Sequence, residues 1–573
     1  MWEVDEIAKY LGTFIQADLH TDRIKVCLSQ KFMNMMTQID ARPLTGMMKV
    51  WIYEHMVKAK MSWDLMVHDI SITWVKEELQ PTVDRMLKKW TSLAKPSSTN
   101  IFYRSKRHFG LHLTHMVNFT KKVQVLRELL LKHSNDPKVA AINRAKEERH
   151  HREVEELRAR WRPSKALAQA ESAVFVQGIL EGSQTGLQGL GFRRVKKINS
   201  DPQHLHRQRV MQQLEIEAET KRFAEEADHT VQGSWQKWQS LAAQDMGWSR
   251  MIYRLSPEAM RFLLNSTMDT CPTPANLRRW QLSTSGTCLL CGQHGTLAHQ
   301  LNSCKPSFPR YLWRHDSILQ IVAQFVRIAV NRGAAVHKRG GRPTKQVQFV
   351  RAGEFIKCNK AERRPDTILE EARDWQLLFD LNYDNTGCKR PTFFPADVFA
   401  TRQIPDGVIW SPEKKIIIIL ELGVPWEENI VESHIRKQAR YEQLEAGLKL
   451  RGWRVTRLEF EVGSRGYVND TVPRLWKTLG LTKREATSAK NKMSDTALLC
   501  SYVIFSARKT PDWRQQHLMG LHFLREDESV QSPHSLKGDF KAVAGAAFTT
   551  GSHPTQRQSP GEFEQQRCLP NHS

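Results

Sequence analysis

The sequence predicts a protein of several domains, with a helical first half, a cysteine-rich segment and a small α/β domain. Three observations predict this organisation. Amphipathic windows at helical spacing recur through the first 230 or so residues. Four Cys and His residues cluster between positions 288 and 304. An isoleucine run, 416–420, follows a shorter apolar run and a turn signal, which is typical of a hairpin with a buried strand.

Bulk properties bound the partners. The chain has 573 residues and a formal net charge of +24, which favours a polyanionic partner. No run of about 18 apolar residues occurs, so no membrane span is expected, and the first residues do not resemble a signal peptide. Nine cysteines in this length do not suggest a disulfide scaffold.

Composition shifts divide the chain into five regions. We expect a helical region, a charged helical linker, a helical linker with the cysteine-rich segment, an α/β domain and a disordered tail rich in Ser, Pro, Gln and Gly. The expected bounds are, in order, 1–135, 136–232, 233–310, 311–515 and 516–573.

Helical patterns and basic clusters mark the first two regions. Helical windows are predicted at 51–60, 81–90, 144–162 and 210–227. Aromatic and basic residues interleave at 101–109, a mixture that suits stacking on bases and contact with phosphate. The alternative for this stretch is a helix core with a solvated basic face. The candidate nucleic-acid contacts here are Arg104, Lys106 and Arg107, together with Arg193, Arg194, Lys196 and Lys197 in the linker.

The cysteine-rich segment has the spacing of a zinc knuckle. It reads Cys288-x2-Cys291-x7-His299-x4-Cys304. Two cysteines two residues apart can turn both thiolates onto one ion, and His299 and Cys304 can complete a tetrahedron. His294 is the rival of His299, but lies too near Cys291 to be the better fourth ligand. We therefore predict structural Zn²⁺ bound by these three cysteines and His299.

The hairpin carries the candidate catalytic carboxylates. Asp406 lies where its first strand begins, and Glu421 lies where the second, buried strand ends. Pairing of the two strands brings these carboxylates together, and such a pair at a hydrophobic sheet end needs a cation. The helical pattern over 426–451 puts Lys437 within reach. Two carboxylates and a lysine predict an Mg²⁺ or Mn²⁺ site for phosphodiester cleavage.

Flanking segments complete the α/β domain and add secondary candidates. Further strands are expected at 375–381 and 453–462, and helices at 467–514. The first of these strands contains Asp380, a possible extra carboxylate. An amphipathic helix opens at Arg314-His315-Asp316, where His315 can contact phosphate, with capping or packing as the alternative role for this trio. Arg339 and Arg342 resemble a minor-groove hook, although a flexible basic loop is the plainer interpretation.

These motifs together resemble one protein family. The strings PD at Pro405-Asp406, ELGVPWE at 421–427 and RKQARY at 436–441 are similar to the restriction-like endonuclease of non-LTR retrotransposon reverse transcriptase polyproteins. That family also carries a Cys-Cys-His-Cys knuckle just before the nuclease. This chain departs from the pattern at Gly423, where the family has Thr, and at Arg440, where it has a second Lys.

The resemblance implies a function and a fold for the second half. It implies an α/β core of the PD-(D/E)xK type that nicks DNA, with Asp406, Glu421 and Lys437 in catalytic roles and Arg440 secondary. The first region resembles the thumb of a reverse transcriptase. No Asp-Asp dipeptide occurs, so a polymerase metal site cannot be built and no DNA synthesis is expected.

The resemblance also implies partners and alternatives. We expect target DNA as a partner in the nucleus, with element RNA and an intact retrotransposon protein as further candidates. The alternative class is a non-catalytic nucleic-acid-binding remnant of such a polyprotein. A degenerate gene fragment is the third.

Overall fold

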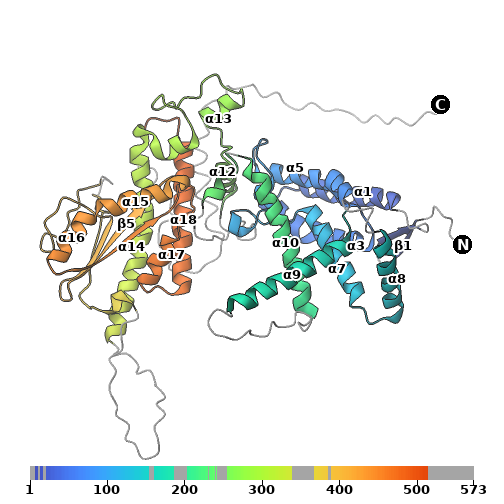
Figure 1. Ribbon diagram of the computed structural model, residues 1–573. Coiled ribbons are helices and arrows are strands. Elements are labelled where there is room, and N and C mark those ends of the chain that lie inside the picture. The colour runs from blue at the N-terminus through green and yellow to red at the C-terminus, as the bar shows by residue number, and fades with distance from the viewer. Residues whose placement is uncertain are drawn as a thin grey trace, which may run out of the picture. The chain divides into compact units, whose positions relative to one another are not determined.

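The first half of the chain is helical in the computed structural model (Figure 1). The structure describes residues 7–10, 13–16, 21–153, 161–185, 203–229, 231–238, 241, 255–338, 367–384 and 389–513. Strands β1 (Ile7–Tyr10) and β2 (Thr13–Gln16) form an antiparallel ribbon before the first helix. The helices that follow are α1 (Asp22–Ala41), α2 (Gly46–Ile52), α3 (Lys58–Val67), α4 (Ile72–Trp74), α5 (Gln80–Thr91), α6 (Asn100–Tyr103) and α7 (Met116–Lys132).

Amphipathic spacing explains these helices. In α1 every third or fourth residue is buried, which makes one continuous apolar face. Helix α5 covers the predicted window 81–90, with a proline in its first turn, where the missing N–H is not needed, and Ser92 in the left-handed conformation (φ 53°) at its end. The predicted window 51–60 is also helical, although it spans α2, a π-helical segment (Tyr53–Val57) and the start of α3.

A second helical group packs on α7. It consists of α8 (Pro137–Glu153), α9 (Pro163–Thr185) and α10 (Gln203–Ala227). Val125 and Leu129 of α7 share a buried cluster with Ala170 of α9 and with Val210 and Leu214 of α10. The prediction over 210–227 is therefore confirmed and the real helix begins earlier. The predicted window 144–162 lies partly in α8 and partly outside the described residues.

Two short helices lead to the cysteine-rich segment. Helix α12 (Pro257–Thr267) begins where predicted, because Ser256 accepts the Ala259 N–H at 3.2 Å and Pro257 occupies the first turn. Helix α13 (Pro274–Arg279) is capped in the same way by Thr273. The segment 287–304 follows directly and ends on a π-helical turn, His299–Ser303.

A mixed four-stranded sheet forms the centre of the α/β region. Its order is β3-β4-β5-β6, with bounds Gln376–Phe379, Gly407–Ser411, Ile416–Gly423 and Arg454–Glu461. The predicted hairpin is confirmed, because β4 and β5 pair antiparallel with Gly407 opposite Leu420. Strands β5 and β6 pair in parallel. Every residue of β5 is buried, as its isoleucine run predicts.

Helices cover the sheet and link it to the rest of the region (Figure 1). They are α14 (Phe308–Lys338), α15 (Ile430–Arg440), α16 (Glu442–Leu450), α17 (Thr471–Thr478) and α18 (Lys483–Ser506). Helices α14 and α18 run side by side. On one sheet face, Tyr441, Leu444 and Leu448 pack on apolar residues of β4 and β5.

Two sequence expectations about these helices need correction. The single helix expected over 426–451 is two helices, which meet at Tyr441. Helix α14 begins at Phe308, six residues before Arg314. Arg314, His315 and Asp316 therefore lie inside a helix and do not cap it.

Among the described helices, none combines the length and the apolar content that crossing a membrane requires.

Candidate active site and metal centre

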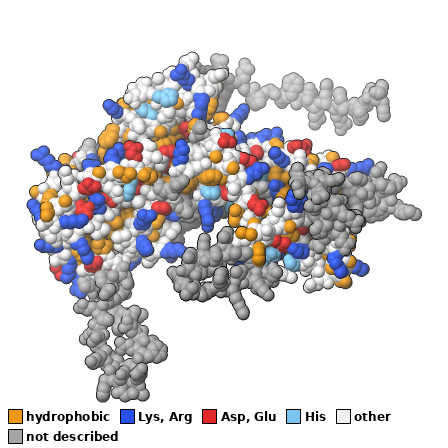
Figure 2. Space-filling model, in the orientation of Figure 1, with side chains coloured by type: hydrophobic (Ala, Val, Ile, Leu, Met, Phe, Trp, Pro, Cys, Tyr) orange, Lys and Arg blue, Asp and Glu red, His pale blue; other side chains and the backbone are white. Residues whose placement is uncertain are grey.

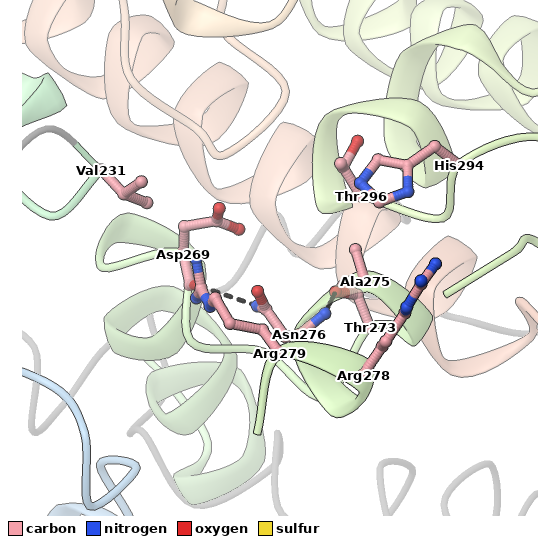
Figure 3. Close-up of a pocket in the computed structure, with 9 residues that line it drawn as sticks. All are labelled: Val231, Asp269, Thr273, Ala275, Asn276, Arg278, Arg279, His294 and Thr296. Carbon is pink, nitrogen blue, oxygen red and sulfur yellow. Dashed lines mark hydrogen bonds between the residues drawn. The ribbon is translucent and has the colours of Figure 1, made fainter. Parts of the chain in front are cut away.

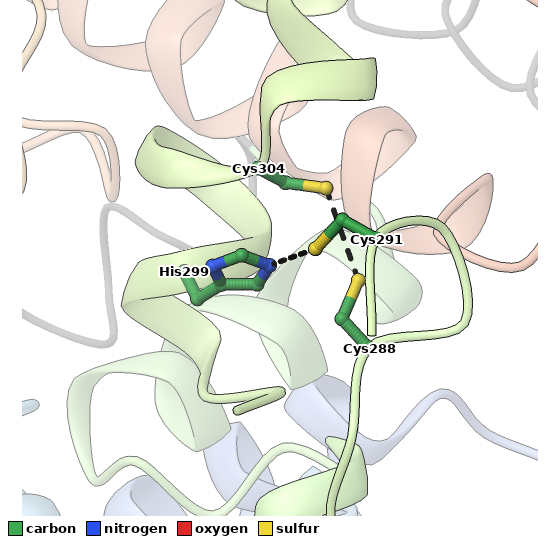
Figure 4. Close-up of side chains that lie close together, drawn as sticks. All are labelled: Cys288, Cys291, His299 and Cys304. Carbon is green, nitrogen blue, oxygen red and sulfur yellow. Dashed lines mark hydrogen bonds between the residues drawn. The ribbon is translucent and has the colours of Figure 1, made fainter. Parts of the chain in front are cut away.

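The four predicted zinc ligands converge on one point (Figure 4). The sulfur atoms of Cys288 and Cys304 are 3.8 Å apart, and Cys291 Sγ lies 3.1 Å from His299 Nε2. All four potential ligand atoms lie within 4.8 Å of one another. His299 rather than its rival His294 belongs to the cluster, as the sequence predicted.

Local backbone geometry explains why the cysteines converge. The Cys288 N–H donates to Gln293 O at 2.6 Å, and the Gly292 N–H donates to Cys288 O at 2.8 Å. Gly292 has φ 74°, a left-handed conformation that glycine adopts without strain. This tight turn brings the Cys288 and Cys291 side chains to the same side. The π-helical turn brings His299 and Cys304 to them from the other side.

The cluster fits a structural zinc ion. Zinc–sulfur bonds of about 2.3 Å in a tetrahedron place two sulfur atoms roughly 3.8 Å apart, which is the separation of Cys288 and Cys304. Three thiols and one imidazole fill all four positions, so none remains for water or substrate. Three of the four side chains are buried. The arrangement is compatible with zinc that holds the knuckle together and takes no part in chemistry.

The hairpin register brings the two candidate carboxylates together. Gly407 pairs with Leu420, so one more step places Asp406 opposite Glu421 at the sheet end. The Asp406 N–H donates to Glu421 Oε2 at 3.3 Å, and Asp406 Oδ2 accepts the Leu422 N–H at 2.7 Å. Glu421 is only 3% exposed, so both carboxylates stand in a place that disfavours unpaired charge.

Lys437 supplies a cation from helix α15. Its Nζ lies 3.0 Å from Glu421 Oε1 and 3.8 Å from Asp406 Oδ2, and it also donates to Leu422 O. Helix α15 packs on β5 and β6, which is what carries the lysine back over the strand end. The structure thus brings together all three residues that the sequence singled out for catalysis.

His315 approaches the same carboxylate from helix α14. Its Nε2 lies 3.2 Å from Asp406 Oδ2 and 3.3 Å from Leu422 O, while its Nδ1 lies 2.9 Å from Asp316 Oδ1. Both ring nitrogens face oxygen acceptors, so both must donate and the ring is an imidazolium. Burial alone would lower the pKa of His315, but the Asp406 and Asp316 carboxylates outweigh it and raise the pKa to about 10.

The two carboxylates differ in their proton affinity. Burial raises the pKa of Glu421, and the neighbouring negative charge of Asp406 raises it further, although Lys437 acts in the opposite direction. Burial would also raise the pKa of Asp406, but His315 and Lys437 together bring it below its usual value. Two close carboxylates commonly separate in this way, because they resist carrying two negative charges at once.

Three oxygen groups therefore meet at the end of β5: the carboxylates of Asp406 and Glu421 and the carbonyl of Leu422. Lys437 contacts all three, and His315 contacts two of them. Oxygen donors of this kind are those that Mg²⁺ and Mn²⁺ prefer. The donor set fits a hard divalent cation.

The other secondary candidates lie apart from this cluster. Asp380 forms an ion pair with Lys389 at 2.8 Å, and Lys389 also reaches Asp316 at 3.0 Å. Asp380 touches the site through its backbone, because its N–H donates to Asp406 O at 3.0 Å. Arg440 is exposed and packs against the ring of Tyr441, so it makes no contact with the carboxylates.

One pair beside the site was missed from the sequence. Glu461, at the end of β6, is fully buried, and its carboxylate contacts His434 Nδ1 of α15 at 2.7 Å. Asn469 and Thr471 donate to its other oxygen. The parallel register sets Glu461 beside Gly423, where a Cβ would lie 3.0 Å from the Glu461 Cγ. No motif marks Glu461; only the strand pairing shows that it neighbours the site.

The candidate nucleic-acid contacts have different outcomes. Arg104 is 1% exposed, pairs with Glu226 at 3.2 Å and lies over the Trp235 ring. The expectation that Arg104 contacts nucleic acid needs correction, because its charge is already used inside the fold. Lys106 and Arg107 are exposed on a 3₁₀ turn. The remaining candidates lie outside the described residues: Arg193, Arg194, Lys196, Lys197, Arg339 and Arg342.

Surface charge does not single out one of these stretches. Figure 2 shows Lys and Arg side chains spread over the visible face, with Asp and Glu among them. On that face, the positive charge of the chain is therefore distributed and is not gathered in one patch. Comparison with known proteins adds no assignment: no protein-family model matches this chain, and no curated protein is similar to it.

Proposed function

We propose that this chain is a restriction-like DNA endonuclease that nicks its target with a divalent metal ion. The observation that carries the proposal is the convergence of Asp406, Glu421 and Lys437 at the end of one buried strand. A hairpin with an acidic residue at each mouth, followed by a helix that returns a lysine, matches the expected PD-(D/E)xK arrangement. The zinc cluster supports it, since a closed knuckle typically serves nucleic-acid binding.

The roles of the residues follow from their positions. A divalent ion held by Asp406, Glu421 and the Leu422 carbonyl would activate water and offset charge on the phosphate. Lys437 orients the attacking water and stabilises the phosphate charge, because its Nζ already stands against both carboxylates. His315 holds Asp406 in place, and Asp316 in turn fixes the His315 ring.

The proposed origin is a non-LTR retrotransposon polyprotein that lacks the polymerase palm. The order of the parts supports it: a helical region, a Cys₃His cluster and a small α/β region follow one another in this chain. Target DNA in the nucleus is the proposed substrate. Element RNA and an intact retrotransposon protein are the further proposed partners.

A second function is a nucleic-acid-binding protein without nuclease activity. One observation favours it: His315 and Lys437 already offset the two carboxylates in the structure. A site so neutralised is stable without a metal ion, and its fold can persist after catalysis is lost.

A plasmid nicking assay separates the two functions. The full chain is incubated with supercoiled plasmid and Mg²⁺ or Mn²⁺, and formation of the open circle is measured. We expect nicking by the parent chain and its loss in Asp406→Asn and Lys437→Met. Glu413→Gln is the matched control, because Glu413 is an exposed carboxylate at the opposite end of the same hairpin. Equal nicking by Asp406→Asn would refute the assignment.

A further inference from the structure

A cavity of about 540 Å³ opens between helix α13 and the zinc-knuckle turn (Figure 3). It is separate from the carboxylate site, and none of its lining residues belongs to that site. Its size falls in the range of about 300–1,000 Å³ that small-molecule sites occupy. The lining residues are Val231, Asp269, Thr273, Ala275, Asn276, Arg278, Arg279, His294 and Thr296.

Two hydrogen-bond acceptors belong to one side of this cavity. Asn276 Nδ2 donates to the backbone oxygens of Asp269 and Cys271, at 2.8 and 2.9 Å. These two bonds fix the amide, so its Oδ1 is the atom left to face the cavity (Figure 3). The Asp269 carboxylate accepts no hydrogen bond from any residue that the structure describes. Burial raises the pKa of Asp269, an effect that Arg465 and Arg279 oppose.

The backbone at Asp269 is held in an unusual conformation. Its φ is 49°, in the left-handed region that few non-glycine residues adopt. The turn after α12 fixes it there, since the Asp269 N–H donates to Ser266 O and Thr270 N–H donates to Asn265 O. A half-buried carboxylate without a partner, on a rigid turn, calls for a ligand that donates hydrogen bonds.

Cations form the rest of the rim. Arg278 and Arg279 end helix α13, and His294 projects from the knuckle turn opposite them (Figure 3). All three side chains are exposed, and neither arginine forms an ion pair within the described part of the chain. Arginines in this setting suit phosphate oxygens.

We propose that this cavity binds one unpaired nucleotide of a single-stranded nucleic acid, with an amino-bearing base on Asp269 and Asn276 and phosphate on the arginine rim. Adenine, cytosine and guanine each present an exocyclic amine to such acceptors. Thymine and uracil present carbonyl oxygens there instead, which a carboxylate repels. A base in a duplex has this edge occupied by its partner, so the strand must be unpaired.

The zinc cluster supports the walls of this site. The Ala275 N–H donates to Gly295 O at 3.2 Å, which joins α13 to the knuckle turn. Thr296, which lines the cavity, accepts the N–H of the zinc ligand His299 at 3.1 Å. Loss of the metal therefore loosens one wall of the nucleotide site. The proposal goes beyond the proposed nuclease activity, and it stands whether or not the carboxylate pair cuts DNA.

The test measures binding of labelled short homopolymers of dA, dC and dT, and of rA and rU, to the full zinc-loaded chain without Mg²⁺. We expect the parent to prefer the amino-bearing strands over dT and rU by about tenfold. Asp269→Asn should abolish that preference, and asparagine tolerates the left-handed backbone at this position. Arg278→Gln with Arg279→Gln should weaken every strand alike, on the order of tenfold, and reduce the salt dependence.

Controls separate this result from the nuclease proposal and from free nucleotides. Arg474→Gln removes an exposed cation elsewhere and should bind as the parent does. Asp406→Asn should also bind normally, so failure of nicking leaves the binding result intact. Competition by AMP or CMP as strong as that by the strands would assign the site to free nucleotides. A parent without base preference, or one unchanged in Asp269→Asn, would overturn the proposal.

Discussion

Lys437 of helix α15 places its Nζ 3.0 Å from the Glu421 carboxylate of strand β5. The lysine is absent from the strand itself, where Gly423 follows Leu422, and a helix returns it to the strand end instead. The arrangement makes Lys437 the partner of two carboxylates that are otherwise buried against each other. Several consequences for stability and metal binding can be measured.

The ion pair predicts that Lys437→Met is destabilising when no divalent ion is present. Removing the cation leaves two close carboxylates with His315 as their remaining counter-charge, at an expected cost of about 1–3 kcal/mol. Added Mg²⁺ should restore more stability to the variant than to the parent, because the ion replaces the lost charge. Denaturant unfolding of the full chain with and without Mg²⁺ measures both effects.

Lys449→Met is the matched control for that comparison. Lys449 pairs with Glu445 on the surface of α16, an exposed pair whose loss should cost less than about 1 kcal/mol and show no response to Mg²⁺. Equal stability of Lys437→Met and the parent in both conditions would show that Lys437 does not neutralise the carboxylates.

The Cys₃His cluster predicts one tightly bound zinc ion per chain. Cys291→Ser replaces a thiolate by a poor zinc ligand, so the metal content of the purified chain should fall well below one ion. Cys27→Ser is the control, because Cys27 lies on α1 outside the cluster and its loss should leave the metal content unchanged. Metal analysis by mass spectrometry gives the answer, and full zinc in Cys291→Ser would exclude the assigned cluster.

The crowding at Gly423 predicts that restoring the family residue is harmful. In Gly423→Thr the new Cβ meets the Glu461 Cγ at 3.0 Å, and the rest of the side chain adds to the clash. Overpacking of this kind typically costs about 1–3 kcal/mol. The double variant with Glu461→Ala should lose less stability than the sum of the two single variants. Additive losses in unfolding experiments would mean that the two positions are not coupled.

His115 predicts a loss of stability in mild acid. Burial is the main cause that lowers the pKa of His115 from 6.5 to about 3, and its Nδ1 has no hydrogen-bond partner. The unfolded chain therefore takes up this proton near pH 6.5 while the folded chain resists it, so stability falls as the pH drops from 6.5 towards 3. The slope from this group is at most about 1.4 kcal/mol per pH unit.

The variant His115→Gln should make the stability profile between pH 6.5 and pH 5 flatter than that of the parent. His133→Gln is the control, because His133 is exposed at the end of α7. A profile that is equally steep in His115→Gln would show that other groups cause the acid sensitivity.

Local patterns were sufficient to predict the hairpin, the knuckle and the reach of Lys437. The isoleucine run fixes β5 as a buried strand, and the turn before it fixes the register that sets Asp406 opposite Glu421. Cysteine spacing fixes the cluster in the same way. In each case the residues that interact are close in sequence or belong to two segments joined by a short turn.

Long-range neighbours could not be predicted from the sequence. Glu461 meets His434 only because β6 pairs in parallel with β5 and α15 crosses both. Arg104 looked like a surface cation within an aromatic and basic stretch, but Glu226, more than a hundred residues later, buries and neutralises it. The start of α14 at Phe308 was missed because the pattern before Arg314 lacks a clear cap.

The most direct test of the account is a Mn²⁺ titration of the full zinc-loaded chain, followed by electron paramagnetic resonance. The account predicts one Mn²⁺ site per chain that disappears in Asp406→Asn and in Glu421→Gln and remains in the Glu413→Gln control. A parent chain that binds no Mn²⁺ at this site, or an Asp406→Asn variant that binds it as well as the parent, would contradict the assignment of a catalytic metal site to the end of β5.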